Sequence, residues 1–420
     1  MDLLGKIFKR QDQNLIFVQI LSYRDPLLVS TLKDLFYKAS KPDNLRVYVL
    51  NQWHPDDNID LSDFKDDSRV EIMSSESNLS EGVCWARNII NKKYSSEKYT
   101  LQINSHHKFI RGWDTELINM LDRLIEKGHK KPILTTYVPK YPPTEGIRTP
   151  LYKIGYKEIT KTGDIITTPI LITNKPTNPT PTQFLSGNFI FTLGRFCQDV
   201  PYNPEIYFNS EEITMAIRAY TSGYDLFTPH KIILWDENLE EGSKKHQDNH
   251  GLEGFEFRSN SLTKKLLEMD GEICSPCLKK RMGEYFLGSE RTLYQYEEFA
   301  GIHFKNRSAT THTIDNLPPP GPKSKGEFKS QFYERQHYKM VFPIESLQGH
   351  VEFDFWAIIL LDEKNVEIHR QDLDKFTVDM IIKSSKSDIT VGGSYKGRPY
   401  TKWIVWPHKD KWLNRINGKK

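Results

Sequence analysis

Two hydrophobic periodicities alternate along the first third of the chain. Short apolar runs rich in β-branched and aromatic residues predict strands, and between them apolar residues recur every three to four positions, as on one face of a helix. In the first such helix Asp25 can act as the cap and Pro26 suits the first turn. The predicted strands are residues 14–21, 45–50, 70–73, 99–103 and 132–136, and the predicted helices are residues 25–38, 81–92 and 115–126. This order is typical of a Rossmann-like α/β domain with a parallel sheet, which binds ligands at the carboxyl ends of its strands.

The pattern changes after residue 141. Residues 142–181 are rich in Thr, Pro and Ile with weak alternation, which predicts a hairpin excursion or a flap. A strand at 183–192, a helix at 211–221 and a strand at 232–235 follow. The polar, His-rich stretch 236–260 lacks a clear period and predicts a loop, and helical patterning returns over 262–299.

Prolines and a glycine at 317–325 mark a linker, because they exclude regular hydrogen-bonded structure. The β-biased runs beyond it, at 351–361, 375–383, 388–391 and 402–406, predict a small all-β domain of the sandwich type. The domains that we expect are an α/β domain over 1–315 with a helical part at 262–306, a Pro-rich linker over 316–328, and an accessory β domain over 329–420.

Composition narrows the class of protein. The 420 residues are 37% hydrophobic and 27% charged, as in a folded protein of two to three domains. The mean hydropathy of −0.59 and the lack of an apolar run near the ~20 residues that cross a bilayer exclude an integral membrane protein. The N-terminus is too charged for a secretory signal, and four cysteines argue against a disulfide scaffold, so we expect a cytoplasmic protein with reduced thiols. A net charge of +3 neither indicates nor excludes a nucleic-acid partner.

Polar side chains gather where predicted strands end and helices begin. Asn104, Ser105 and His106 follow the strand 99–103, where a metal-bound diphosphate would fit, although a polar surface loop explains them equally. Glu211 and Glu212 open a helix, where acidic residues can simply favour the helix dipole.

A series of short segments, each weak alone, occurs in an order that identifies a family. They are IFVQILSYRDP (16–26), NQ (51–52), EGVCWAR (81–87), LQINSHHKFIRGWD (101–114), LTTYVPKY (134–141), FLSGNFIF (184–191), VPYNPEIYFNSEEITMAIRAYTSGYDLFTP (200–229), ILWDEN (233–238) and RTLYQYEEFAGIHF (291–304). Over residues 14–306 the chain thereby resembles the cytoplasmic hydroxyproline N-acetylglucosaminyltransferases. These are retaining glycosyltransferases of the GT-A fold that use UDP-GlcNAc and a divalent metal.

The resemblance implies a nucleotide-sugar site with named residues. Those expected against uridine, diphosphate and sugar are Ser22, Tyr23, Arg24, Asp25, Gln52, Arg87, Asn104, Ser105, Gly187 and Asn188. Arg87 would neutralise pyrophosphate charge as a planar bidentate donor, and Gly187 would let the backbone approach the sugar. Glu211 and Glu212 match a pair of acids in the family and are the expected catalytic residues, which hold sugar hydroxyls or orient the acceptor. Trp113 and Asp114 are expected either to support the residues that touch substrate or to lie on the acceptor side.

The metal site departs from the family pattern at two positions. Asn104 stands where the family has aspartate, and Asp236 stands where it has histidine. Because one change removes a carboxylate and the other adds one, we expect Mn²⁺ or Mg²⁺ to be held by His106 and Asp236, with Asn104 contributing its carbonyl or a bound water. The rival hypothesis is that the site has drifted and binds metal poorly.

Two further features leave alternatives open. Cys274 and Cys277 form a CxxC that His246 and His250 could complete as a zinc set, but unliganded cysteines in a turn, or histidines at the rim of the active site, explain these residues as well. The aromatic residues of the C-terminal domain are mostly core by alternation, whereas Tyr400, Trp403 and Trp406 near basic residues could form an acceptor platform.

The resemblance thus predicts an enzyme that moves a sugar, GlcNAc, from UDP to a hydroxyl of a protein (hydroxyproline, Ser or Thr) or of a glycan, with retention of configuration. One alternative is a catalytically degenerate protein that binds sugar nucleotide or a partner. Another is a transferase acting on hydroxylated DNA bases, which would require an exposed basic groove.

Overall fold

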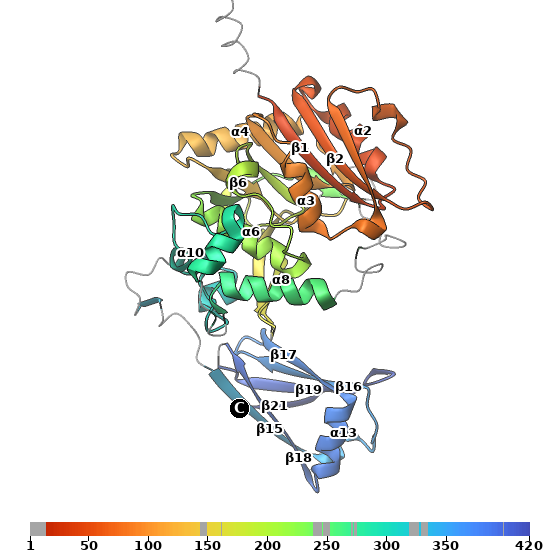
Figure 1. The fold of residues 1–420 in the computed structure, drawn as a ribbon. Helices are drawn as coiled ribbons and strands as arrows, with labels where there is room; N and C mark the ends of the chain where they lie inside the picture. The colour runs from red at the N-terminus through yellow and green to blue at the C-terminus, as the bar shows by residue number, and fades with distance from the viewer. Residues whose placement is uncertain are drawn as a thin grey trace, which may run out of the picture. The chain divides into compact units, whose positions relative to one another are not determined.

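The computed structural model describes residues 14–142, 149–160, 162–237, 246, 253–269, 272, 275–318, 327–328, 335–397 and 399–420. The chain divides into two compact units, and we describe each by itself (Figure 1). Unit 1 comprises Met1–Arg307 and Asn316–Pro319, and unit 2 comprises Ser308–Asp315 and Pro320–Lys420. Most of the predicted linker, residues 319–326, lies outside the described residues.

Unit 1 contains strands, helices and short 3-10 turns. Its strands are β1 (Ile16–Tyr23), β2 (Leu45–Trp53), β3 (Val70–Glu76), β4 (Tyr99–Asn104), β5 (His107–Phe109), β6 (Pro132–Thr135), β7 (Tyr152–Ile159), β8 (Ile165–Leu171), β9 (Thr180–Pro181), β10 (Phe189–Leu193), β11 (Asp225–Thr228), β12 (Leu234–Asp236) and β13 (Ile302–His303). Its helices are α2 (Leu28–Lys38), α3 (Val83–Asn91), α4 (Trp113–Glu126), α5 (Phe196–Asp199), α6 (Glu211–Thr221), α8 (Glu253–Leu266), α9 (Pro276–Met282) and α10 (Leu293–Ala300). The 3-10 turns are η1 (Pro42–Asn44), η2 (Ser62–Phe64), η3 (Ser77–Leu79), η4 (Phe208–Ser210) and η6 (Gly283–Tyr285).

An eight-stranded sheet forms the centre of unit 1, with the strand order β3-β2-β1-β4-β10-β6-β11-β9. Strands β3, β2, β1 and β4 run parallel, as do β6 and β11, whereas β10 is antiparallel to both β4 and β6. The predicted α/β class is therefore confirmed. Leu21 of β1 pairs in register with Leu50 and with Asn104, so the carboxyl ends of β1, β2 and β4 meet at one edge.

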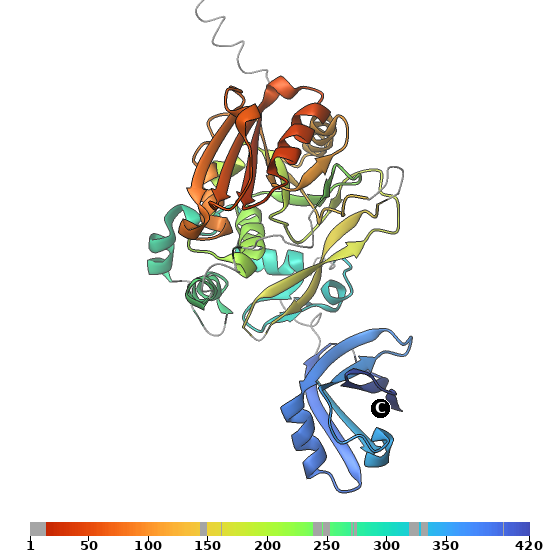
Figure 2. The same cartoon turned by 90° about the vertical axis from the view of Figure 1, so that its right-hand side faces the viewer.

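Helices cover both faces of this sheet (Figures 1 and 2). Ile16, Val18 and Ile20 of β1 belong to the core cluster that includes α2 and α4, and the intervening Phe17 packs with Ala86 of α3 on the other face. A strand that is covered on both faces needs apolar residues at successive positions. The unbroken apolar run at the start of the chain meets that need.

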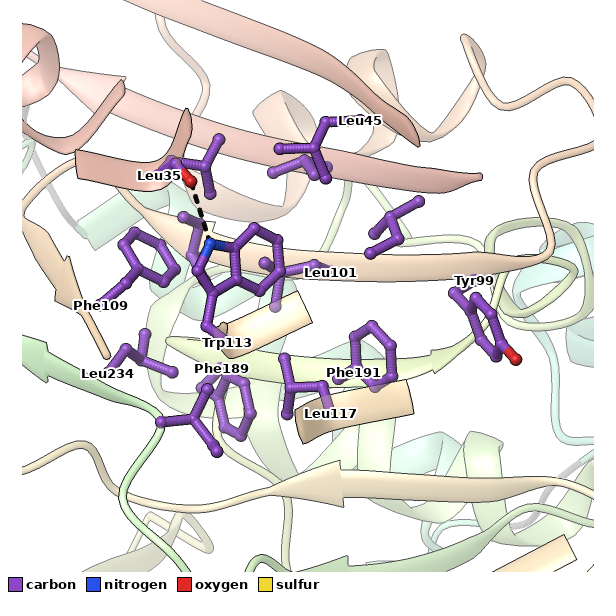
Figure 3. Packing of buried hydrophobic residues seen from close by; sticks show 14 of the residues in the cluster. Leu35, Leu45, Tyr99, Leu101, Phe109, Trp113, Leu117, Phe189, Phe191 and Leu234 are labelled. Carbon is purple, nitrogen blue, oxygen red and sulfur yellow. Dashed lines mark hydrogen bonds between the residues drawn. The ribbon is translucent and has the colours of Figure 1, made fainter. Parts of the chain in front are cut away.

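Figure 3 shows the core between the sheet, α2 and α4. Trp113 is fully buried, and its Nε1 donates to the carbonyl of Leu35 at 2.9 Å. Asp114 is also buried, and its carboxylate accepts from the backbone nitrogens of Ser40 and Lys41 at 2.8 Å each. These buried side chains join α4 to α2, which favours a supporting role for Trp113 and Asp114 over direct contact with an acceptor.

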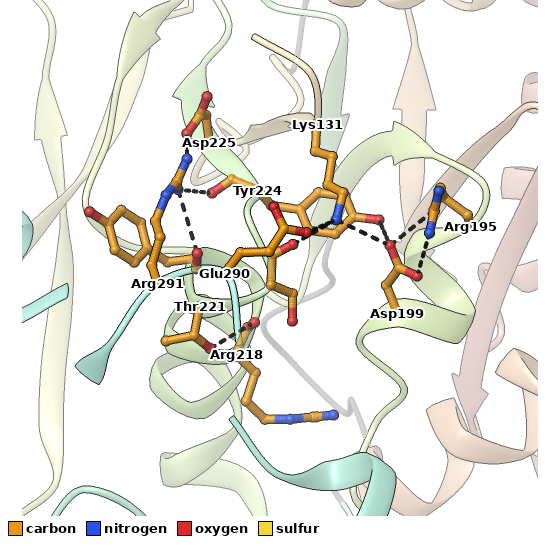
Figure 4. A network of polar contacts seen from close by, with 11 residues as sticks. Lys131, Arg195, Asp199, Arg218, Thr221, Tyr224, Asp225, Glu290 and Arg291 are labelled. Atoms are coloured by element: carbon orange, nitrogen blue, oxygen red, sulfur yellow. Dashed lines mark hydrogen bonds and ion pairs between the residues drawn. The ribbon is translucent and has the colours of Figure 1, made fainter. Parts of the chain in front are cut away.

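Polar contacts fix the C-terminal end of α6 (Figure 4). The carbonyl of Thr221 accepts from the backbone nitrogen of Glu290 at 2.9 Å, and Arg291 donates to Asp225 at 2.6 Å. Lys131 pairs with Glu290 in the same network. Because one end of α6 is fixed in this way, its other end, which carries the two predicted catalytic acids, has a defined position.

Several element boundaries differ from the prediction. Helix α2 begins at Leu28 after a cap at Leu27, and Asp25 accepts from the Leu27 nitrogen at 2.9 Å without capping the helix. Helix α8 begins at Glu253, so the expected loop over 236–260 is wrong for its last residues. The excursion after residue 141 contains the antiparallel hairpin β7–β8, drawn in yellow in Figure 2.

Unit 2 is built mainly from antiparallel strands. Its elements are β14 (Ser308–Ala309), α11 (Thr311–Ile314), β15 (Arg335–Pro343), η7 (Ile344–Leu347), β16 (Phe355–Leu361), β17 (Glu367–Asp374), α13 (Lys375–Ser384), β18 (Asp388–Lys396), β19 (Lys402–Lys409), β20 (Lys411–Trp412) and β21 (Ile416–Lys419). The pair β15–β18 forms one sheet, and β17-β16-β19-β20, with β21 on β19, forms another.

The strand predicted over 375–383 is wrong, because α13 occupies this stretch. Asp374 caps the helix by accepting from Thr377, and Val378, Ile381 and Ile382 pack on the core at helical spacing. Unit 2 is therefore not all-β.

The aromatic residues near the C-terminus separate into two groups. Tyr400 and Trp403 are buried in the core of unit 2 and cannot form the expected acceptor platform. Trp406 is half-buried, with its ring 4.3 Å from that of Trp412 and under the guanidinium of Arg415 at 3.9 Å. In the part of the chain that the structure describes, no helix is both long enough and apolar enough to cross a membrane.

Candidate active site

One cavity in unit 1, of about 390 Å³, is lined by residues from several distant segments, among them α3, β8 and the stretch after β6. The predicted site residues in its lining come from the end of β4, the turn before β10 and the start of α6. The predicted site residues that line it, called the cavity cluster below, are Asn104, Gly187, Asn188, Glu211 and Glu212. Segments that are about 80 and 25 positions apart in the chain are thus brought to one place by the sheet order.

Gly187 lies between the two acids of the cavity cluster. Its nitrogen donates to Glu212 Oε1 at 2.9 Å. A Cβ at this position would lie 2.6 Å from Glu211 Oε1, closer than atoms in contact allow. Its carbonyl accepts from Gln102 Nε2 at 2.8 Å. A larger residue here would displace the Glu211 carboxylate, whereas the predicted close approach of the backbone to the sugar stays a prediction.

The two glutamates are held in an environment that disfavours their charge. Burial raises the pKa of Glu211 to about 7; Arg87 acts in the opposite direction and Glu212 adds to the increase. Burial also raises the pKa of Glu212, although the Gly187 nitrogen and the hydroxyl of Tyr137 oppose it. Within the described residues, the buried Oε1 of Glu211 has no hydrogen-bond partner. Perturbed acids beside a cavity are typical of a functional site.

Arg87 reaches the lining of the cavity through Asn104 and, at 3.4 Å, through the carbonyl of Gly187. Its side chain is fully buried, and Nη2 donates to Asn104 Oδ1 at 2.9 Å. Asn104 Nδ2 in turn donates to Asn188 Oδ1 at 2.9 Å. In this arrangement the guanidinium bonds to protein groups, and a direct contact of Arg87 with pyrophosphate stays a prediction. The bond from Arg87 uses one lone pair of the Asn104 carbonyl oxygen, so a metal contact through the second lone pair or through a bound water stays a prediction.

The second group of predicted residues surrounds His106 at the edge of the sheet. We call it the edge cluster, and its members are Ser22, Tyr23, Arg24, Asp25, Gln52, Ser105, His106 and Asp236. Asp25 Oδ2 accepts from Ser105 Oγ at 2.6 Å and lies 2.7 Å from His106 Nδ1. Antiparallel pairing of β12 with β5 brings Asp236 to the same point, with Oδ1 3.9 Å from His106 Nε2.

Opposite charges shift the pKa values of this pair. Burial lowers the pKa of His106, but the hydrogen bond and charge of Asp25, with the charge of Asp236, hold it above its ordinary value. Burial raises the pKa of Asp25, and the hydrogen bonds from His106 and Ser105 outweigh it, so the pKa of Asp25 is lowered.

The residues around His106 fit a divalent ion by their chemistry. The described residues contain no group of three His, Cys, Asp or Glu side chains arranged for a metal. His106 and Asp236 offer one imidazole nitrogen and one carboxylate, both of which transition metals accept, while Asp25 holds the other ring nitrogen as a carboxylate does behind a ligating histidine. A metal would then take its remaining ligands from water or substrate.

The predicted nucleotide residues are held by protein partners. Arg24, at a φ of 52°, pairs with Asp57 through two nitrogens at 3.0 and 3.1 Å. Gln52 accepts from Ser80 Oγ at 2.5 Å and donates to the Ser22 carbonyl at 3.3 Å. Both are therefore fixed before any ligand arrives.

Two polar atoms beside these residues lack such partners. Ser22 Oγ and Asn51 Oδ1 are buried without a hydrogen bond among the described residues, and the two residues pair in register on β1 and β2. Buried polar atoms of this kind suggest a ligand or a water that would satisfy them.

His246 joins the edge cluster through aromatic contacts. Its ring centroid lies 5.4 Å from that of Tyr23, and Nδ1 lies 2.9 Å from the hydroxyl of Tyr207. This position is compatible with the rim of the site. Cys274 and His250 lie outside the described residues, so the zinc alternative stays a prediction.

Sequence reasoning gave no role to three residues that the structure brings to the sites. Tyr137 and Phe208 line the cavity, and Asp57 binds Arg24. Tyr137 and Phe208 lie inside segments that carry the family resemblance, which is the one signal that could have found them. Asp57 lies in a polar loop with no pattern.

Comparison with known proteins gives a family match. The model of the glycosyltransferase (GlcNAc) family matches residues 15–67 and 56–306. No curated protein matches the sequence.

Solved structures give similarity at low identity. GalNAc-T7 with UDP, GalNAc and Mn²⁺ is 12% identical over 69% of this chain, with a TM-score of 0.46. TarS 1–349 of S. aureus in complex with UDP-GlcNAc is 15% identical over 61% of this chain and 67% of its own, with a TM-score of 0.40. The mannosyltransferase PcManGT from Pyrobaculum calidifontis with GDP-Man and Mn²⁺ is 10% identical over 57% of this chain and 64% of its own, with a TM-score of 0.35. The match spans 56% of the length of the GalNAc-T7 chain.

Proposed function

The chain belongs to the GlcNAc glycosyltransferase family, and from this premise we propose that it transfers N-acetylglucosamine from UDP-GlcNAc to a hydroxyl group with retention of configuration. The observation that supports this most is the cavity cluster, in which residues from three distant segments line one cavity. The three described cysteines that are free suit the cytoplasmic location that we propose with it.

The two glutamates have different tasks in this proposal. Glu212 lines the cavity and holds a hydroxyl of the sugar or acceptor, while Glu211, buried against Gly187, positions the turn that Gly187 begins. Both oxygens of Glu212 already accept hydrogen bonds, from Gly187 and from Tyr137 at 3.3 Å, which weakens it as a nucleophile. Retention is then best served by reaction on one face: the bond from C1 to phosphate breaks, the acceptor oxygen bonds to C1, and its proton passes to the leaving phosphate.

The donor nucleotide lies at the carboxyl ends of β1 and β2. The unpartnered Ser22 Oγ and Asn51 Oδ1 are acceptors for an N–H group such as that of uracil. Tyr23 and Arg24 follow directly on β1 and flank this position.

His106 and Asp236 would hold the divalent ion, and Asp25 orients His106. When bound there, the ion stabilises the negative charge of the leaving diphosphate. Arg87 contributes indirectly by fixing Asn104 and thereby Asn188.

The acceptor is a protein hydroxyl or a glycan. The charged residues among those that line the cavity are Glu211 and Glu212, both acidic, which disfavours a polyanion such as DNA in this cavity.

A UDP-release assay over a panel of UDP-sugars tests the proposal, with and without Mn²⁺, on the wild type and on Asp236→Ala. We expect release from UDP-GlcNAc that requires metal and is lost in the variant. If the folded protein binds UDP-GlcNAc but releases no UDP from any donor, the degenerate binding protein is the better description. If Mn²⁺ changes nothing and Asp236→Ala keeps full turnover, the metal assignment is wrong.

A further inference from the structure

The cavity has a polar side and an apolar side. Asn104, Asn188 and Glu212 supply amide and carboxylate groups, whereas the apolar lining includes Phe184, which is buried. Phe208 differs from its apolar neighbours because 54% of it is exposed. Among the described residues that line the cavity it is the one exposed large apolar side chain, so its ring offers a ligand the most accessible apolar surface there.

The backbone of Phe208 is strained. Its φ of 28° is in a region that bulky residues rarely adopt, and such outliers cluster at functional sites. The turn is anchored to α8 on both sides of Phe208: the Tyr207 nitrogen donates to Ser259 Oγ at 2.9 Å, and Ser210 Oγ, two residues after Phe208, donates to Asn260 Oδ1 at 3.3 Å. These anchors hold the turn in place whatever residue lies at position 208.

Folding does not explain phenylalanine at this position. The ring gains little from burial, and glycine or asparagine would adopt the backbone at lower cost. In the unliganded protein, phenylalanine at position 208 costs free energy through its exposed ring and through its strained backbone. Contact of the ring with a ligand is the best explanation for its presence.

We infer that Phe208 is the platform for the ring of a neutral saccharide acceptor, whose hydroxyls are held by Asn188, Asn209 and Glu212. A sugar ring has an apolar C–H face and a polar rim, which match the two sides of the cavity. The two acidic residues in the lining favour an acceptor without negative charge. This inference rests on the proposed function and specifies its acceptor.

The experiment compares Phe208→Gly and Phe208→Trp with the wild type. UDP release from UDP-GlcNAc is measured in water, with methyl glycosides of glucose, galactose and N-acetylglucosamine, and with a 4-hydroxyproline peptide. Phe208→Gly removes the ring and also relieves the strained φ, so its melting temperature should equal or exceed that of the wild type. We expect it to lose at least tenfold more of the glycoside-stimulated release than of the release in water, and Phe208→Trp to restore most of that loss.

Phe257→Ala is the matched control, because Phe257 is 76% exposed on α8 and does not line the cavity. It should behave as the wild type in every arm. A loss in Phe208→Gly that is equal in water and with glycosides would mean that the ring contacts the donor and would overturn the inference. Stimulation of the wild type by the peptide alone, or by neither probe, would overturn the saccharide class.

A binding measurement separates this inference from the proposed function. Saturation-transfer NMR of methyl N-acetylglucosaminide requires no turnover. If the wild type releases no UDP but binds the glycoside, and Phe208→Gly does not, the proposed function fails and the platform stands. If both proteins bind the glycoside equally, the platform is wrong.

Discussion

The carboxyl groups of the cavity cluster and of the edge cluster have pKa values shifted in opposite directions. In the cavity cluster, Glu211 and Glu212 are buried with raised pKa values beside open space. In the edge cluster Asp25 has a lowered pKa and pairs with His106, and Arg24 pairs with Asp57. In the cavity cluster, burial of the two carboxyl groups costs free energy, and a ligand that donates hydrogen bonds can reduce this cost. In the edge cluster the charged groups already have partners in the protein, so a ligand must replace one of these partners to bind. The two clusters are therefore prepared for ligands in different ways, and substitutions in each should have different effects on UDP release and on metal binding.

The largest effect is expected from Glu212→Gln. Glutamine can still accept from the Gly187 nitrogen through its carbonyl oxygen, so the turn keeps its place, but the negative charge at the cavity is lost. We expect UDP release to fall by about 10- to 100-fold, because a hydrogen bond from a substrate hydroxyl to a charged group contributes about 1.5–3 kcal/mol. Steady-state kinetics with UDP-GlcNAc would measure it.

Glu116→Gln is the control for this substitution. Glu116 is a half-exposed residue of α4 that pairs with Lys231, and it does not line the cavity. Surface ion pairs contribute about 0–1 kcal/mol, so this variant should keep wild-type kinetics. If Glu212→Gln and Glu116→Gln had equal kinetics, the cavity cluster would have no part in the reaction.

Asp25→Asn should have the next largest effect, on the edge cluster. The substitution replaces an acceptor of the Ser105 and His106 bonds by an amide, and so loosens the orientation of His106. Loss of such a carboxylate behind a ligating histidine costs about 10- to 100-fold in metal affinity. The Mn²⁺ concentration that gives half-maximal UDP release should rise by that factor.

Asp57→Asn tests whether the effect of Asp25→Asn is specific to metal binding or follows from any substitution around the edge cluster. It breaks the pair with Arg24 but leaves Asp25 and His106 untouched. We expect a higher KM for UDP-GlcNAc with an unchanged Mn²⁺ requirement. A shift in the Mn²⁺ requirement as large as that of Asp25→Asn would mean that the two parts of the edge cluster act as one.

The sheet of unit 1 could be predicted from the sequence because its elements are long and periodic. The members of the cavity cluster could not be found in this way: Gly187 and Glu211 lie 24 positions apart, and only the order of segments shared with a family pointed to both. The pairing of Asn104 with Arg87 also escaped prediction, since a strand end and a helix 17 positions earlier meet only through the sheet register.

Two errors have local physical causes. The stretch that forms α13 contains Val378, Ile381 and Ile382, whose β-branched side chains favour strands, but the Asp374 cap and packing on the sheet select a helix. The positive φ of Phe208 has no sequence signal, because neither glycine nor asparagine lies there and anchors on α8 impose the conformation.

The smallest effect is expected in the pH dependence of stability, from Glu211→Gln. The pKa of Glu211 is raised from 4.5 to about 7, so the native state holds this proton between those two values while the unfolded state releases it. The stabilisation is complete below pH 4.5 and is lost as the pH rises through about 7. Between pH 5 and pH 8 we expect the wild type to lose roughly 1 to 2.5 kcal/mol from this residue, and the variant to lose correspondingly less. Urea unfolding at both pH values would measure the difference.

Glu297→Gln is the control that shows whether the titration of Glu211 affects UDP release or only the stability of the fold. Burial raises the pKa of Glu297 to about 7 as well, but its carboxylate accepts from the Phe304 nitrogen and does not line the cavity. Both variants should therefore flatten the fall in stability between pH 5 and pH 8. Only Glu211→Gln should also change the pH profile of UDP release, because Glu211 contacts Gly187 and both residues line the cavity. If the two variants change the pH profile of UDP release to the same extent, burial alone explains both raised pKa values. The raised pKa of Glu211 would then be no evidence that the cavity cluster takes part in the reaction.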